Sequence, residues 1–165
     1  MARIPYPDLG KASPEVREML GRLPAPANIF NMLAHAETCV KPVMKLGGTL
    51  LGKLMLEPKL RELCLLHAVK LEGGEYEWAQ HVPIALDLGC TQAQIGALAG
   101  GDDMAPCFDA REKAVLRLTR GAVQDAAASE AQLTPVRAHL CAASAGISPR
   151  PRRPPGALFS RPDDG

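Results

Sequence analysis

The chain has 165 residues, a length typical of one domain, and 47% of them are hydrophobic while only 4% are aromatic. A core built mainly from Leu, Ala, Val and Met favours helices over sheets. The 19 Lys and Arg side chains nearly balance the 18 Asp and Glu side chains, so the composition argues against a nucleic-acid-binding surface.

Neither a membrane span nor a secretion signal is recognisable in the sequence. No apolar run approaches the ~20 residues that cross a bilayer. The N-terminal "MARIPYPDLG" lacks the basic-then-apolar order of a signal peptide. Five cysteines are scattered without any C-x-x-C spacing. We therefore expect a cytoplasmic protein whose thiols are reduced and mostly buried.

Helix signals begin near the N-terminus and recur at short intervals. Ser13 followed by Pro14 predicts a capped helix start. The stretch "ANIFNMLAHAETCVKPVMKLGGTLLGKLML" reads as two helical pieces, and we expect the second to be weakened near Pro42 and the Gly47–Gly48 pair.

Two further helices are predicted on either side of Gly73–Gly74. The first begins at Pro58, and its apolar seam is spaced by three and four residues: Leu56, Leu60, Leu63, His67 and Leu71. The second runs from about Glu75 to Leu88 and is followed by Gly89, a residue type that commonly ends a helix. One face of this second helix should carry Trp78, His81, Val82, Ala85 and Leu88.

Capping boxes predict the remaining helix starts, and they pair Thr91 with Gln94, Asp109 with Glu112, and Ser129 with Gln132. No segment alternates with a period of two residues, so we expect an all-α domain over residues 1–141. Residues 142–165 are rich in Pro and Arg and hold few large apolar side chains, so we expect a disordered tail there.

The stretch "GGEYEWAQHVPIALDLG" gathers unusual chemistry in a short space. Because the preceding connection is short, its helix should pair antiparallel with residues 58–71, and this brings Glu62 level with His81. Glu77, four residues before His81, can reach the same ring, and Tyr76 can add a weak acid or hydrogen-bond donor. A carboxylate facing an imidazole is a proton-transfer unit, although a buried ion pair with a purely structural role fits the residues equally well.

Metal binding is a further hypothesis for these residues. Glu77 and His81 have a spacing compatible with metal ligands, and His67 or His35 can be imagined as additional ligands. Helical bundles that hold metals usually repeat an E-x-x-H unit on several helices, and this sequence does not. We therefore expect no metal centre.

The stretch "PKLRELCLLHAVKLEGGEYEWAQHVPIALDLGCTQAQIGAL" resembles the carboxymuconolactone decarboxylase family, which includes the alkylhydroperoxidase D-like proteins. The segments "ARIPYPDL", "NIFNMLAHA" and "DAREKAVLRLTR" extend the resemblance to roughly residues 1–140. It implies an alkylhydroperoxidase D-like helical bundle that assembles as trimers or hexamers, with active sites near subunit interfaces. In similar proteins an apolar helix follows "VRAHL", whereas here the Pro/Arg-rich tail takes its place.

The resemblance also implies roles for particular residues. Peroxidase members use a glutamate, a C-x-x-C and a histidine. In this sequence the glutamate corresponds to Glu62 and the histidine to His81, while the two cysteine positions are occupied by Gly74 and Glu77. Cys64 should point to a different side of its helix. Because both thiols are missing, the sequence is closer to the decarboxylase members, which act on an unsaturated lactone carboxylate without metal or organic cofactor.

The resemblance to the decarboxylase members implies that Glu62 and His81 form an acid–base pair, with Tyr76 or Glu77 nearby. Two alternatives remain open: an antioxidant peroxidase with a degenerate site, and a non-enzymatic oligomeric helical protein that binds a ligand.

Overall fold

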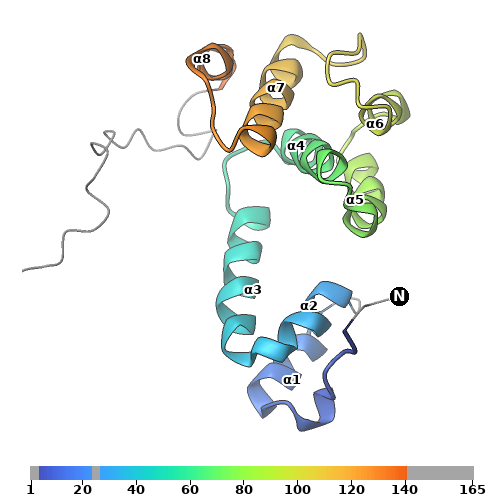
Figure 1. Cartoon of the computed structure of the whole chain (residues 1–165), viewed down its shortest axis with the longest axis vertical. Helices are drawn as coiled ribbons and strands as arrows, with labels where there is room; N and C mark the ends of the chain where they lie inside the picture. The colour runs from blue at the N-terminus through green and yellow to red at the C-terminus, as the bar shows by residue number, and fades with distance from the viewer. Residues whose placement is uncertain (1–3, 24–26, 141–165) are drawn as a thin grey trace, which may run out of the picture. The chain divides into compact units, whose positions relative to one another are not determined.

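The computed structural model describes residues 4–23 and 27–140, and every regular element within these ranges is helical (Figure 1). The prediction of an all-α fold is therefore confirmed. The predicted tail and the boundary at residues 141–142 lie outside the described residues. Within the same ranges, no helix combines the length and the apolar character that a bilayer span requires. The chain divides after Leu54 into two compact units.

The first unit is a small helical cluster. It contains the short 3-10 helices η1 (Leu9–Lys11) and η2 (Ala34–Ala36) and the α-helices α1 (Pro14–Gly21), α2 (Asn28–Leu33) and α3 (Glu37–Gly52). The predicted cap is present, since the Ser13 hydroxyl accepts a hydrogen bond from the backbone N–H of Val16. The backbone N–H of Ser13 also donates to Glu37 Oε2 over 3.0 Å, which fastens the start of α1 to the start of α3.

Helix α3 passes Pro42 and the Gly47–Gly48 pair without a break, so the expected weakening does not interrupt it. Pro42 lies in the second turn, where its missing N–H removes only the one hydrogen bond to the carbonyl of Thr38. Val40 is fully buried in the first unit, whereas a neighbouring side of the same helix is apolar and exposed. That side carries Val43, Leu46 and Leu50, which are 44%, 59% and 44% exposed.

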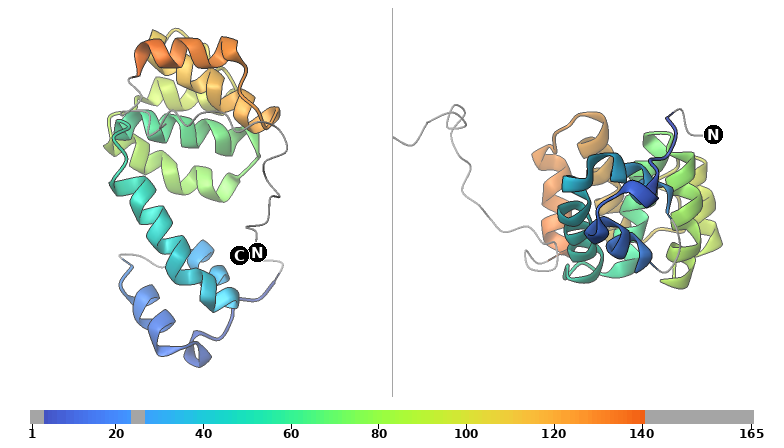
Figure 2. Two further views of the ribbon diagram at one scale, coloured as in Figure 1. Left: turned by 90° about the vertical axis from the view of Figure 1, so that its left-hand side faces the viewer. Right: turned by 90° about the horizontal axis from the view of Figure 1, so that it is seen from below.

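The second unit is a layered bundle of α4 (Pro58–Leu71), α5 (Glu75–Asp87), α6 (Gln92–Ala99), α7 (Ala110–Gln124) and α8 (Glu130–His139). Figure 2 shows these helices stacked in the spatial order α5, α4, α7, α8, and α6 also contacts α4. The main apolar core lies around Leu63, Leu66, Leu98, Phe108 and Leu116. Helix α4 is therefore the central element, with neighbours on several sides.

The α4–α5 hairpin is ended at both helices by the glycines that the sequence predicted. At the end of α4, Gly73 has a left-handed φ of +71°, and the N–H of Gly74 donates to the carbonyl of Val69 over 2.9 Å. At the end of α5, Gly89 has a φ of +92° and Cys90 donates to Ala85 over 2.9 Å. Glycine adopts a left-handed backbone at little cost in free energy, so the glycines themselves specify where both helices end.

The predicted face of α5 is only partly buried. Ala85 is fully buried, and Trp78 and Val82 pack against the same core. Leu88, which was expected to share that face, is 36% exposed instead. It is the residue at which the helix ends, so its side chain no longer follows the helical pattern.

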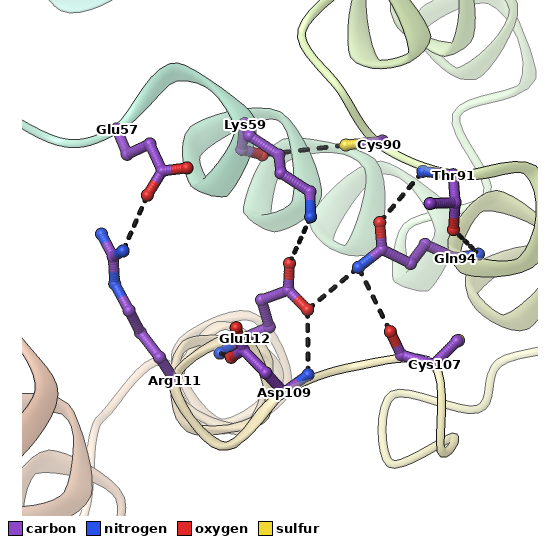
Figure 3. A network of polar contacts seen from close by, with 9 residues as sticks. All are labelled: Glu57, Lys59, Cys90, Thr91, Gln94, Cys107, Asp109, Arg111 and Glu112. Carbon is purple, nitrogen blue, oxygen red and sulfur yellow. Dashed lines mark hydrogen bonds and ion pairs between the residues drawn. The ribbon is translucent and has the colours of Figure 1, made fainter.

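All three predicted capping boxes are present, and one of them extends into a polar network (Figure 3). Glu112 is buried; its Oε2 accepts hydrogen bonds from the N–H of Asp109 over 3.0 Å and from Gln94 Nε2 over 2.9 Å. Its Oε1 lies 2.8 Å from Lys59 Nζ, and this carboxylate raises the pKa of Lys59. One carboxylate therefore joins α4, α6 and α7, so its removal would leave partly buried partners unpaired.

A second polar cluster holds α4 to the loop that connects α6 with α7. His67 is fully buried, and its Nε2 lies 3.3 Å from Asp103 Oδ2. Asp103 also accepts a 2.8 Å hydrogen bond from Arg120 Nε. Neither ring nitrogen of His67 has a partner of hydrogen-bonding geometry within the part of the chain that the structure describes. The imidazole thus lies near a carboxylate, but its ring nitrogens do not form hydrogen bonds of normal geometry.

Burial lowers the pKa of His67, and the nearby Asp103 opposes this only in part. The folded protein therefore favours the neutral ring, while the unfolded chain binds a proton below about pH 6.5. The free energy of unfolding should have its full His67 contribution above that pH and lose it as the pH falls. The pKa of Asp103 is also lowered, because contacts with Arg120 and His67 outweigh its burial, so its contribution is lost at more acidic pH.

We predict that replacing His67 with Leu flattens the decline in unfolding free energy between pH 7 and pH 5, because the unfolded variant no longer takes up that proton. Urea unfolding at several pH values measures this. The matched control is His139→Gln, at an exposed histidine of α8, which should keep the parent's slope. Equal slopes for the parent and His67→Leu would contradict the role given to the buried ring.

Candidate active site

The α4–α5 hairpin brings a buried carboxylate against an imidazole. Glu62 is fully buried in α4, and its Oε2 lies 2.8 Å from Nδ1 of His81 in α5. The His81 side chain remains 17% exposed. The predicted contact between these two residues is therefore confirmed, and it follows from their similar distances to the Gly73–Gly74 turn.

The second oxygen of Glu62 is held by its neighbour in sequence. Arg61 places Nε and Nη2 each 3.2 Å from Glu62 Oε1. A buried carboxylate costs several kcal/mol unless its charge and lone pairs are matched, and here a guanidinium and an imidazole share that role. Sequence reasoning missed Arg61, because adjacent helical residues start about 100° apart and are not expected to meet.

The contact with Glu62 determines which ring nitrogen of His81 can react. An ionised carboxylate only accepts hydrogen bonds, so Nδ1 of His81 must carry the shared proton. In the neutral ring this leaves Nε2 as the basic nitrogen. Nε2 lies 4.0 Å from Glu77 Oε2, whose side chain is 38% exposed. The imidazole thus stands between one buried and one half-exposed carboxylate.

Tyr76 is placed differently from the other predicted site residues. It is 39% exposed and lies five residues before His81, about 140° around the helix. The ring nitrogens of His81 contact Glu62 and Glu77. Glu62 and Glu77 thus both contact His81, whereas the side chain of Tyr76 starts from a different side of α5.

The residues considered as additional metal ligands lie elsewhere. Nε2 of His35 lies 2.9 Å from the carbonyl of Pro5, and His67 faces Asp103. Across residues 4–23 and 27–140, no group of three or more His, Cys, Asp or Glu side chains is arranged to hold a metal ion.

The cysteines are less uniformly buried than expected. Cys90 is buried, Cys64 and Cys107 are partly buried, and Cys39 is exposed, all as free thiols; Cys141 lies outside the described residues. Cys64 packs against the cluster formed by α7 and α8, on a different side of α4 from Glu62. Burial raises the pKa of the Cys64 thiol, which reduces its thiolate fraction near neutral pH.

The chain was compared with known proteins to identify the family to which it belongs. No curated protein and no solved structure matches the chain. The model of the carboxymuconolactone decarboxylase family matches residues 40–121, which contain the whole of α4, α5 and α6 and most of α7. Glu62, Glu77 and His81 all fall within the match. By this match, residues 40–121 belong to the carboxymuconolactone decarboxylase family.

Proposed function

We propose that the chain is a cofactor-free acid–base enzyme of the decarboxylase type, acting on a small carboxylate such as an unsaturated lactone from aromatic breakdown. The observation that carries this proposal is the 2.8 Å contact between buried Glu62 and His81 Nδ1. It fixes the ring and its tautomer, and it leaves Nε2 on the more open side to exchange a proton with a substrate.

The proposed reaction requires only proton transfer and the stabilisation of charge. The bond between the substrate's carboxylate carbon and its ring carbon breaks, CO₂ leaves, and the electron pair passes into the unsaturated ring as an enolate-like anion. Protonated His81 donates from Nε2 to the ring, and solvent restores that proton. Glu62 stabilises the imidazolium while it exists, as the carboxylate of a catalytic triad does. Glu77, half exposed and 4.0 Å from Nε2, is suited to pass protons from solvent.

The two alternatives have less support. A peroxidase of the family type needs thiols at the positions of Gly74 and Glu77, and the thiol of Cys64 has a raised pKa and packs on another side of α4. A purely structural Glu62–His81 pair accounts for the burial of Glu62. It assigns no role to Nε2 of His81, which lies 4.0 Å from the half-exposed Glu77 carboxylate.

We also propose that the chain self-associates and resides in the cytoplasm. The family resemblance implies trimers or hexamers, and α3 presents Val43, Leu46 and Leu50 at a spacing that forms one apolar stripe. A second copy of the chain is the occupant that the resemblance supports for this stripe. Free cysteines, rather than disulfides, are in keeping with the reducing cytoplasm.

We predict that His81→Asn and Glu62→Gln each lower kcat/KM for decarboxylation of a carboxylated unsaturated lactone by about 10²–10⁴-fold, as removal of a general acid–base group does. CO₂ release measures the rate, and thermal unfolding checks that each variant is folded. Asp87→Asn is the matched control and should retain activity, because it removes an exposed carboxylate near the end of α5. Folded variants with parent-like rates would leave Glu62–His81 as a structural pair.

We predict no hydroperoxide consumption supported by a dithiol reductant, because Gly74 and Glu77 provide no thiol. The assay follows peroxide loss with dithiothreitol in excess and with metal chelated. The control is Cys64→Ser, which should match the parent. Peroxide turnover by the parent that disappears in Cys64→Ser would favour the peroxidase alternative.

We predict that Leu46→Lys shifts the protein toward smaller species, because it places a charge in the apolar stripe of α3. Sedimentation velocity over a range of concentrations measures the change. Lys45→Glu, at an exposed residue on a different side of the same helix, provides the control. A monomeric parent chain at all concentrations would contradict self-association.

A further inference from the structure

A half-open cavity of about 240 Å³ lies beside the turn between α4 and α5, and the end of α6 forms part of its wall. These helices are neighbours in Figure 1. Its lining comes from the end of α4, the turn, the start of α5 and the end of α6, and includes Val69, Lys70, Gly74, Glu75, Trp78 and Ala99. The acid–base pair is not part of this lining, so the cavity is a separate feature of the hairpin.

The walls of the cavity are suited to one small ring. Val69, Trp78 and Ala99 supply apolar surface, and an indole stacks favourably on a flat unsaturated or aromatic ring. The volume lies below the ~300–1,000 Å³ of pockets that hold drug-sized ligands. A monocyclic ligand therefore fits the space better than a larger one.

Gly74 keeps one wall of this cavity open. A Cβ added at position 74 would lie 3.2 Å from Val69 Cγ1, which is closer than such atoms ordinarily pack. Any larger side chain there would also extend into the space next to Trp78. The absence of a side chain at this position thus has a structural consequence apart from the absence of a thiol.

One cationic side chain gives the cavity a single point at which it can hold an anion. Lys70 is exposed and is the one cationic side chain of the lining. The positive end of the α5 dipole is already faced by Glu75 and Glu77 in the first turn. Glu75, itself part of the lining, opposes an anion, so Lys70 is left as the group that recognises it.

The cavity and the acid–base pair are linked through Glu77. Positions 74, 78 and 81 share one side of α5, since their spacing is four and three residues. A Cβ at position 74 would lie 4.0 Å from Glu77 Cβ, and Glu77 Oε2 lies 4.0 Å from His81 Nε2. A ligand in the cavity would therefore lie one helical turn from the proton-transfer site.

We propose that this cavity binds a monocyclic unsaturated or aromatic carboxylate, with its ring against Trp78 and its carboxylate at Lys70. The inference depends on the proposed function in one respect only: we expect a substrate bound here to be decarboxylated. Binding itself is a separate claim, and Trp78 reports on it directly because it is the one tryptophan of the chain.

The test is titration of the full-length protein with benzoate, followed by Trp78 fluorescence, with benzyl alcohol as the neutral ligand of similar shape. We expect a saturable change and tighter binding of benzoate by about fivefold, as one exposed ion pair provides. Lys70→Met should remove the preference for benzoate, and Glu75→Gln should strengthen it. Lys53→Met, at an exposed lysine of the first unit, should leave it unchanged.

Gly74→Leu should abolish binding of both ligands while His81 and Glu62 remain intact. Lys70→Met keeps the test meaningful if Gly74→Leu does not fold, because Lys70 is at the surface. No saturable change with benzoate, or equal binding by the parent and Lys70→Met, would overturn the inference. Saturable benzoate binding, together with no CO₂ release from a carboxylated unsaturated lactone, would instead refute the proposed function and leave this site standing.

Discussion

The burial of the Glu62 carboxylate in the middle of α4 is the constraint on which the site depends. Such a group is tolerated only where its charge is matched, and removing one partner of a buried pair typically costs about 3–5 kcal/mol. Here the imidazole of His81 lies 2.8 Å away on one oxygen, and the guanidinium of Arg61 lies 3.2 Å away on the other. The pairing fixes the distance and rotation between α4 and α5, and it also selects the ring nitrogen that faces outward.

Helix α4 can hold this geometry because it is fastened on its other sides as well. Lys59 reaches Glu112 in α7, and His67 approaches Asp103 in the loop before α7. Polar residues of α4 thus meet partners on three neighbouring segments, while Leu63 and Leu66 fill the core between them. A proton-transfer pair carried by a helix fastened in this way keeps its geometry better than one on loops.

Much of the second unit could be predicted because its signals are local. Capping residues three positions apart, and glycines with left-handed backbone at positions 73 and 89, specify helix ends without reference to the rest of the fold. The Glu62–His81 contact was also predictable, since a short turn leaves the two helices only one way to pair.

Contacts that depend on tertiary packing could not be predicted. Arg61 meets its own neighbour by bending its long side chain back, and Asp103 reaches His67 from a loop thirty-six residues away in sequence. The cavity beside Trp78 depends on Ala99 from α6, which no spacing along α4 and α5 reveals. The continuity of α3 through Pro42 shows that one lost hydrogen bond in an early turn does not end a helix.

The most direct test of the account is the protonation state of the His81 ring, observed by long-range ¹H–¹⁵N NMR of the full-length protein. The account predicts that Nδ1 carries a proton donated to Glu62, and that this pattern changes in Glu62→Gln. A ring that carries its proton on Nε2 alone, or a spectrum unaltered in Glu62→Gln, would contradict it, because Glu62 would then not orient the nitrogen that exchanges a proton with a substrate.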